Sequence, residues 1–120
     1  MAVHRTSSEI TLVSSGAKTS DGQGNSVDVS RWETGVVFIN VTAVSGTSPM
    51  LTITLEGSPD NSTFYDLHDE TGRPVRIPPL TAVSSFAVPI SGFGKYLRVA
   101  YEVDGTSPSV TFASSFIGKT

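Results

Sequence analysis

Apolar and polar residues alternate along several short segments of this sequence, and this period of two limits what the chain can fold into. The alternation is regular in residues 51–56 and 97–103, and it recurs in 27–30, 37–43 and 110–116. Successive side chains of a strand point to opposite faces, so the pattern predicts half-buried β-strands. No stretch of ten or more residues carries apolar positions at helical spacing, which excludes a mostly helical protein.

The tetrapeptide Gly-Thr-Ser-Pro occurs twice, at Gly46–Pro49 and at Gly105–Pro108, each time between two alternating segments. Each copy predicts a β-hairpin with a loop of about five residues. Either the repeat is chance reuse of a good turn, or two equivalent hairpins pack face to face. We therefore expect an all-β fold, a single-domain antiparallel β-sandwich (Ig-like or jelly-roll-like) with seven to nine strands.

The pattern assigns residues 1–9 to an N-terminal arm and residues 10–120 to the sandwich domain. A first strand is expected at 10–14, followed by a polar, glycine-rich loop at 15–26. Residues 68–79 are polar and proline-rich, which indicates an exposed loop with at most a short edge strand at 75–77. Residues 83–90 form a further expected strand, with Phe86, Val88 and Ile90 facing the core.

Composition narrows the class of protein. With 38% hydrophobic and 16% charged residues in 120, the chain suits one folded domain and not a disordered one. A net charge of −3 does not favour binding to nucleic acid, and no run of apolar residues is long enough to form a membrane-spanning helix. The chain has no cysteine, so disulfides and thiolate sites are excluded. No export signal is recognisable, so we expect synthesis in the cytoplasm.

The sequence offers little for catalysis. Its two histidines, His4 and His68, accompany no nucleophile elbow, phosphate-binding loop or zinc-protease motif. We expect no enzyme activity and no cofactor. One cluster of residues could offer oxygen and nitrogen ligands to a metal ion: Asp66, His68, Asp69 and Glu70. Their spacing matches no EF-hand or zinc pattern, so a solvated surface loop is favoured over a metal site.

Four aromatic residues could either pack in the core or an interface, or together form a surface on which a sugar ring stacks: Trp32, Phe64, Tyr65 and Tyr96. Packing is the favoured interpretation. The residues expected on the outer faces of the strands are mostly small and polar, among them Thr52, Thr54, Thr111 and Ser115. Such faces favour packing against a partner over stacking on a glycan.

Four pieces of the chain resemble small β-sandwich proteins encoded among the structural genes of tailed bacteriophages. They are Trp32-Glu33-Thr34-Gly35-Val36-Val37, Leu55-Glu56-Gly57-Ser58-Pro59-Asp60, Phe64-Tyr65-Asp66-Leu67 and Gly94-Lys95-Tyr96-Leu97-Arg98-Val99. The Ser-Pro-Asp turn with its following aromatic residue, and the Gly-x-Tyr-Leu-Arg-Val strand, are also similar to pieces of discoidin-like, galactose-binding sandwich domains. The resemblance covers roughly 29–119.

The resemblance implies a virion protein, and at this length a capsid decoration (cement) protein that binds and stabilises the phage head. The implied partners are the major capsid protein or other virion subunits, with the chain itself forming a dimer or trimer. Other roles in the head-neck, tail or fibre, and a non-catalytic carbohydrate-binding module, remain alternatives. The residues expected to bind the partner are His4 and Arg5 in the arm and Asp69, Glu70, Arg73 and Arg76 in the loop.

Overall fold

The computed structural model describes residues 9–68, 73 and 75–119 of the chain. Within them the fold is all-β and antiparallel, as predicted, and its eight strands fall in the expected range. The strands are β1 (Glu9–Lys18), β2 (Gly22–Gln23), β3 (Val27–Asp28), β4 (Thr34–Ser58), β5 (Tyr65–Asp66), β6 (Arg76–Leu80), β7 (Ser84–Ser91) and β8 (Tyr96–Lys119). No helix among the described residues is long and apolar enough to cross a bilayer.

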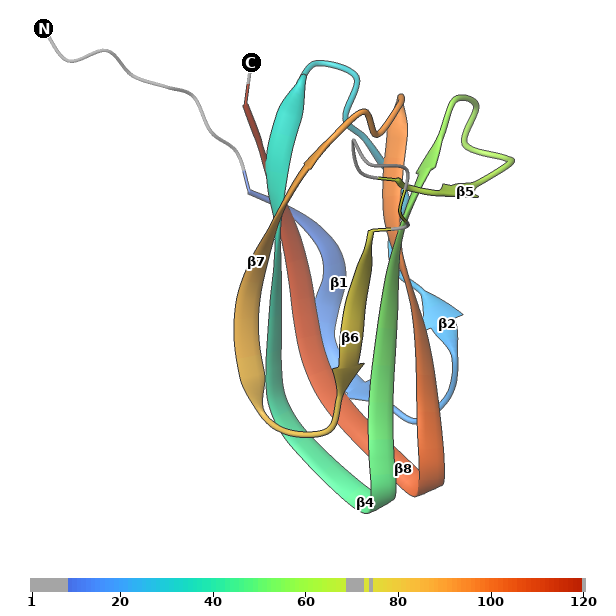
Figure 1. Cartoon of the computed structure of the whole chain (residues 1–120), viewed down its shortest axis with the longest axis vertical. Helices are drawn as coiled ribbons and strands as arrows, with labels where there is room; N and C mark the ends of the chain where they lie inside the picture. Colours follow the sequence, from blue (N-terminus) through green and yellow to red (C-terminus); the bar gives the residue numbers. More distant parts are fainter. Residues whose placement is uncertain (1–8, 69–72, 74, 120) are drawn as a thin grey trace, which may run out of the picture.

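Strands β4 and β8 form one long two-stranded ribbon that folds over on itself. They pair antiparallel from Thr34↔Lys119 at one end to Ser58↔Tyr96 at the other. Both strands turn back at the same level, at the bottom of the view in Figure 1. The ribbon therefore has two halves, which face each other across the core.

Each half of the ribbon is the centre of one layer. Layer A contains β1, the second half of β8 (109–119), the first half of β4 (34–45) and β7, in that order. Layer B contains the second half of β4 (50–58) and the first half of β8 (96–104), with β5 and β6 on one side and β2 and β3 on the other. Alternate residues of both layers meet in one buried cluster, as in Ile39 and Phe112 of layer A and Ile53 and Val99 of layer B.

The two predicted hairpins are wrong. Residues 35–44 do not pair with 51–55; both segments pair with β8 instead, in different layers. The Gly-Thr-Ser-Pro segments bend the chain out of the sheet, with positive φ at Gly46 and Ser48 and at Gly105 and Ser107. Because both strands bend together, the ladder continues through the corner at Thr47↔Thr106. The repeat thus supplies two matching bends that lie side by side.

Local irregularities account for the other differences from expectation. A register shift between Val41 and Ala43 leaves Ala43 exposed, although the alternation placed it in the core. Strand β1 extends to Lys18 and β2 follows it, within the segment expected to be a loop. Between these strands the Asp21 carboxylate accepts the backbone N–H of Val103 (2.8 Å), which satisfies a donor at the edge of β8.

Two buried serines, Ser58 and Ser114, have different surroundings. The Ser58 Oγ accepts the backbone N–H groups of Asp60 and Asn61, at 3.2 and 3.0 Å, and so holds the turn after β4. The Ser114 Oγ is buried within layer A and has no hydrogen-bond partner among the described residues. A buried hydroxyl without a partner costs free energy, whereas a bonded one contributes to stability.

We predict that Gly105→Ala destabilises the protein more than Gly92→Ala. Both glycines have positive φ, 123° and 65°, but a Cβ at Gly105 would lie 2.8 Å from the Ser48 carbonyl oxygen while Gly92 faces open space. We expect losses of about 3 kcal/mol at Gly105 and about 1 kcal/mol at Gly92, measured by urea unfolding. Equal losses would contradict the close packing of the two bends.

A second pair of variants tests the buried serines. Ser58→Ala should lower the free energy of unfolding by about 1–2 kcal/mol, because two backbone donors lose their acceptor. Ser114→Ala should leave it unchanged or raise it by up to about 1 kcal/mol, because an unpaired hydroxyl is removed. The same urea titrations measure both. A loss at Ser114 as large as that at Ser58 would show that the Ser114 hydroxyl is bonded in solution.

Candidate interaction surface

Most of the residues predicted to bind a partner fall beyond what the structure describes. Four of the six lie outside the described residues: His4, Arg5, Asp69 and Glu70. Arg73 is exposed. The backbone of Arg76 pairs with Thr54 in layer B, and its side chain is outside the described part. The partner-binding role of these six residues stays a prediction. Strand β1 begins at Glu9, the last residue assigned to the arm.

The outer face of layer A carries mostly small, uncharged side chains. Its central row crosses all four strands, from Ala87 through Phe38 and Ser115 to Thr11. The next row runs from Ser85 through Asn40 to Ala113, and the Ser85 Oγ donates to the Asn40 Oδ1 (2.6 Å). Among the described residues, the charged side chains in the rows of this face are at one end, at Glu9 of β1 and Lys119 of β8.

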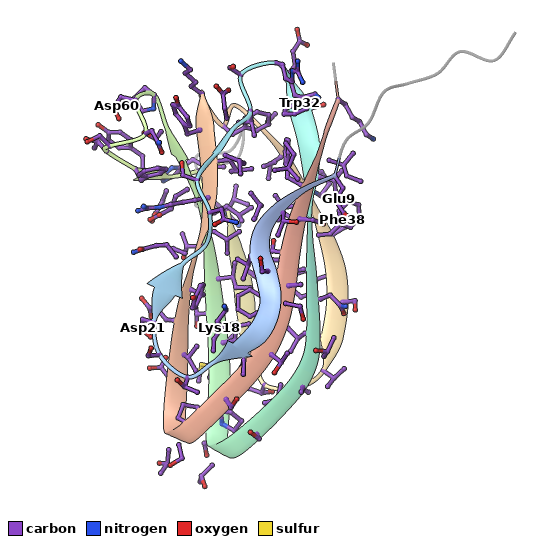
Figure 2. All side chains as sticks on the ribbon, turned by 180° about the vertical axis from the view of Figure 1, so that it is seen from behind. Glu9, Lys18, Asp21, Trp32, Phe38 and Asp60 are labelled. Atoms are coloured by element: carbon purple, nitrogen blue, oxygen red, sulfur yellow. The ribbon has the colours of Figure 1, made fainter. Side chains whose placement is uncertain are left out.

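Among the described residues, Phe38 is the most exposed large apolar side chain of this face, at 39%. It lines a groove of about 580 Å³ between β1, β8 and β4, together with Glu9, Thr11 and Asn40. Figure 2 shows Glu9 and Phe38 next to each other at the beginning of β1. Strand β1 bends beside the groove because its register shifts between Thr11 and Val13 and again between Val13 and Gly16.

The outer face of layer B is charged. Glu56 and Arg98 lie opposite each other on β4 and β8, and the Arg98 Nε donates to the Glu56 Oε1 (2.7 Å). The guanidinium of Arg98 also lies 3.7 Å from the centre of the Phe64 ring. Glu102 follows on the same face of β8. Burying this face against a partner would require desolvation of several charges, whereas the outer face of layer A has few.

The four aromatic residues considered for sugar stacking do not share one surface. Trp32 packs edge-on against Phe116 in the core, with ring centroids 5.7 Å apart, and covers Gly118. Phe64 is covered by Arg98, while Tyr65 is 61% exposed on β5. Figure 2 places Trp32 and Asp60 at the same end of the molecule but on opposite sides. Trp32 therefore packs in the structure and does not join Phe64 and Tyr65 in a platform.

The polar cluster considered for a metal ion is only half described. His68 donates from Nδ1 to the Asp66 carbonyl oxygen (3.0 Å), while Asp69 and Glu70 lie outside the described residues. In the described ranges no three His, Asp or Glu side chains gather as ligands.

The predicted Ser-Pro-Asp turn is built around the carboxylate of Asp60. This carboxylate accepts the backbone N–H groups of Ser62 (2.9 Å) and Thr63 (3.0 Å). These bonds favour the charged form, so they hold the pKa of Asp60 below its usual value of 3.8. The pKa of Asp28 is lowered in the same way, by hydrogen bonds from the side chain and backbone of Ser30. Both carboxylates order loops beside β4 and β3.

These bonds predict an acid dependence of stability. A carboxyl group whose pKa is lowered on folding stabilises the protein above its unfolded pKa, and this contribution disappears as pH falls through the folded value. Asp60→Asn keeps an acceptor oxygen but cannot titrate. Its free energy of unfolding should therefore fall less than that of the wild type between about pH 5 and about pH 2, measured by urea unfolding. The same fall in both proteins would contradict the role of the Asp60 carboxylate.

Comparison with known proteins identifies the fold and no family. No family model matches the chain, and no curated protein matches it. Among solved structures the chain is similar to the SPBc2 prophage-derived protein YomS, with 16% sequence identity and a TM-score of 0.55. The match covers 98% of this chain and 99% of YomS, so the same fold extends over the whole length of both proteins.

Proposed function

We propose that this chain is a structural protein of a tailed-phage virion that decorates the head, binding the assembled shell in many copies through the outer face of layer A. The observation that carries the proposal is the difference between the two outer faces: one is almost uncharged with Phe38 at its centre, and the other is charged. The sequence resemblance to phage virion sandwiches and the full-length likeness to a prophage-derived protein supply the context.

The outer face of layer A suits a protein partner. Interface centres are depleted of charged residues and enriched in aromatic residues. Burying few charges keeps the free-energy cost of desolvation low, and burying an aromatic side chain removes a large apolar area from water. Phe38, next to a groove of about 580 Å³, fits the description of such an anchor. Thr11, Ala87 and Ser115 around it are small, so a flat partner surface can approach closely.

Strand β1 begins beside this groove. Glu9, the first described residue, lines the groove, and its carboxylate accepts the Ser115 hydroxyl (3.0 Å). His4 lies five residues before Glu9, and a segment of that length spans at most roughly 16–18 Å. A subunit that contacts the outer face of layer A next to the groove is therefore within reach of His4 and Arg5, as the predicted arm requires.

A decoration protein must also be stiff. Strands β4 and β8 each run from one layer into the other, and they stay paired on both sides of the bend. The two layers are therefore joined by both strands and cannot slide independently. A partner that binds only the assembled shell stabilises that state by mass action, and the effect grows with occupancy.

The test is binding to empty shells of the phage that encodes the chain. Phe38→Ala should weaken binding at least about tenfold, because an interface anchor is lost. Val83→Ala is the matched control, since Val83 is also exposed (64%) but lies between β6 and β7, and it should bind as the wild type does. Cosedimentation with shells measures both. Equal binding of all three proteins would overturn the use of the outer face of layer A.

Deletion of residues 1–8 tests the arm separately, because it leaves β1 complete. Reduced occupancy on shells, with an unchanged urea midpoint, would support a clasping arm. Electron microscopy of the intact particle separates the decoration role from the alternatives. Density at the neck, tail or fibre would replace it with another virion role, and binding to a glycan array without shell binding would favour a carbohydrate-binding module.

A further inference from the structure

Strand β7 has one long edge that no described strand covers. All eight of its residues pair with β4, from Thr34↔Ser91 to Val41↔Ser84, without a register shift. No other pairing of β7 occurs in the described part of the chain. Figure 1 shows β7 at the outside of layer A, beside the first half of β4. Its opposite edge therefore carries a regular row of unpaired backbone groups.

The other edge strands are protected against pairing. Strand β1 has two register shifts and carries the charged residues Glu9 and Lys18. Strand β6 contains two consecutive prolines and a register shift opposite β4. Strands β2, β3 and β5 have two residues each. Bulges, prolines, charges and short length are the usual means of blocking an edge, whereas β7 has no charge, no bulge and a single proline near its end.

Pro89 shows which backbone groups of β7 point away from β4. Proline has no N–H, so in a regular antiparallel pair it occupies a position whose N–H would face outward. Residues of the same parity share this orientation. The N–H groups of Ser85 and Ala87 therefore point to the open edge, together with the carbonyl groups of Ser85, Ala87 and Pro89.

The side chains along this edge are compatible with a second copy of the chain. On the outer face, Ser85 and Ala87 lie next to Asn40 and Phe38, and none of these is charged. On the inner face, Phe86 and Val88 are only half-buried although they face the core. Two identical edges thus meet without like-charge repulsion, despite the net charge of −3 on each chain. Their pairing covers apolar area that one chain leaves open.

We propose that two copies of this chain pair antiparallel along β7 about a twofold axis, so that layer A continues from one copy into the other. An antiparallel pair of identical edges is self-complementary, as an isologous interface requires. Backbone hydrogen bonds from Ser85 and Ala87 link the copies, and Phe86 and Val88 of each copy lie beside those of its partner. The proposal locates the interface of the symmetric oligomer expected from the sequence, and it does not depend on binding to a shell.

The test compares two variants at one exposed position. Ala87→Pro removes an outward N–H without removing a bond to β4, as native Pro89 already does. Ala87→Thr keeps the N–H and is the matched control. In sedimentation-velocity experiments over a concentration series, the wild type and Ala87→Thr should form dimers, and Ala87→Pro should raise the dimer dissociation constant at least about tenfold. A wild type that stays monomeric at all concentrations, or a folded Ala87→Pro that dimerises normally, would overturn the proposal.

A second measurement does not require a variant to fold. In the wild type, the amide hydrogens of Ser85 and Ala87 should exchange with solvent more slowly in concentrated than in dilute protein. Those of other exposed strand residues, such as Thr11 in β1, should not change. Equal exchange of Ser85 and Ala87 at both concentrations would place any dimer contact elsewhere. Because both experiments use the purified chain alone, their failure leaves the proposed shell binding untouched, and a failure to bind shells leaves the dimer untouched.

Discussion

The antiparallel ladder between β4 and β8 is the interaction on which the rest of the structure depends. It supplies the two central strands of both layers, and every other strand is added to its sides. The ladder can pass from one layer to the other because Gly46 and Gly105 adopt backbone angles that other residues rarely adopt. The centre of each layer therefore joins segments that are distant in the sequence.

The folded ribbon also gives the molecule two different outer faces. In layer A the outward positions of β4 and β8 carry residues such as Phe38, Asn40 and Ser115, while in layer B they carry Glu56, Arg98 and Glu102. Both faces use the same two strands, so the difference comes only from which residues stand at the outward positions of each half. A protein with one neutral and one charged face has a preferred side for contact with a partner.

Much of the fold follows from local patterns, and the errors have local causes too. The alternation predicted the all-β class, the approximate strands and most of the core, including Leu51, Ile53 and Phe112. It misplaced Ala43, because a bulge changes the parity of a strand at one residue. It predicted hairpins at the two Gly-Thr-Ser-Pro segments, because a turn sequence does not show whether the chain returns within the sheet or crosses to another layer. The sequence placed Ser115 on an outer face that favours packing, but it did not give the rows of the candidate surface, because these rows join residues of four strands whose neighbours were not known.

By itself, the sequence determined most of the residues that face inward and outward, since in a strand without a bulge that depends only on the period of two. The tertiary structure decided which strands are neighbours, and with that the position of Phe38 beside Ala87 and Ser115, the groove next to Glu9 and the open edge of β7. Several segments have similar local preferences for the strand conformation, so the sequence pattern does not show which of them pair. The pairing is decided by the arrangement that buries one core shared by all the strands.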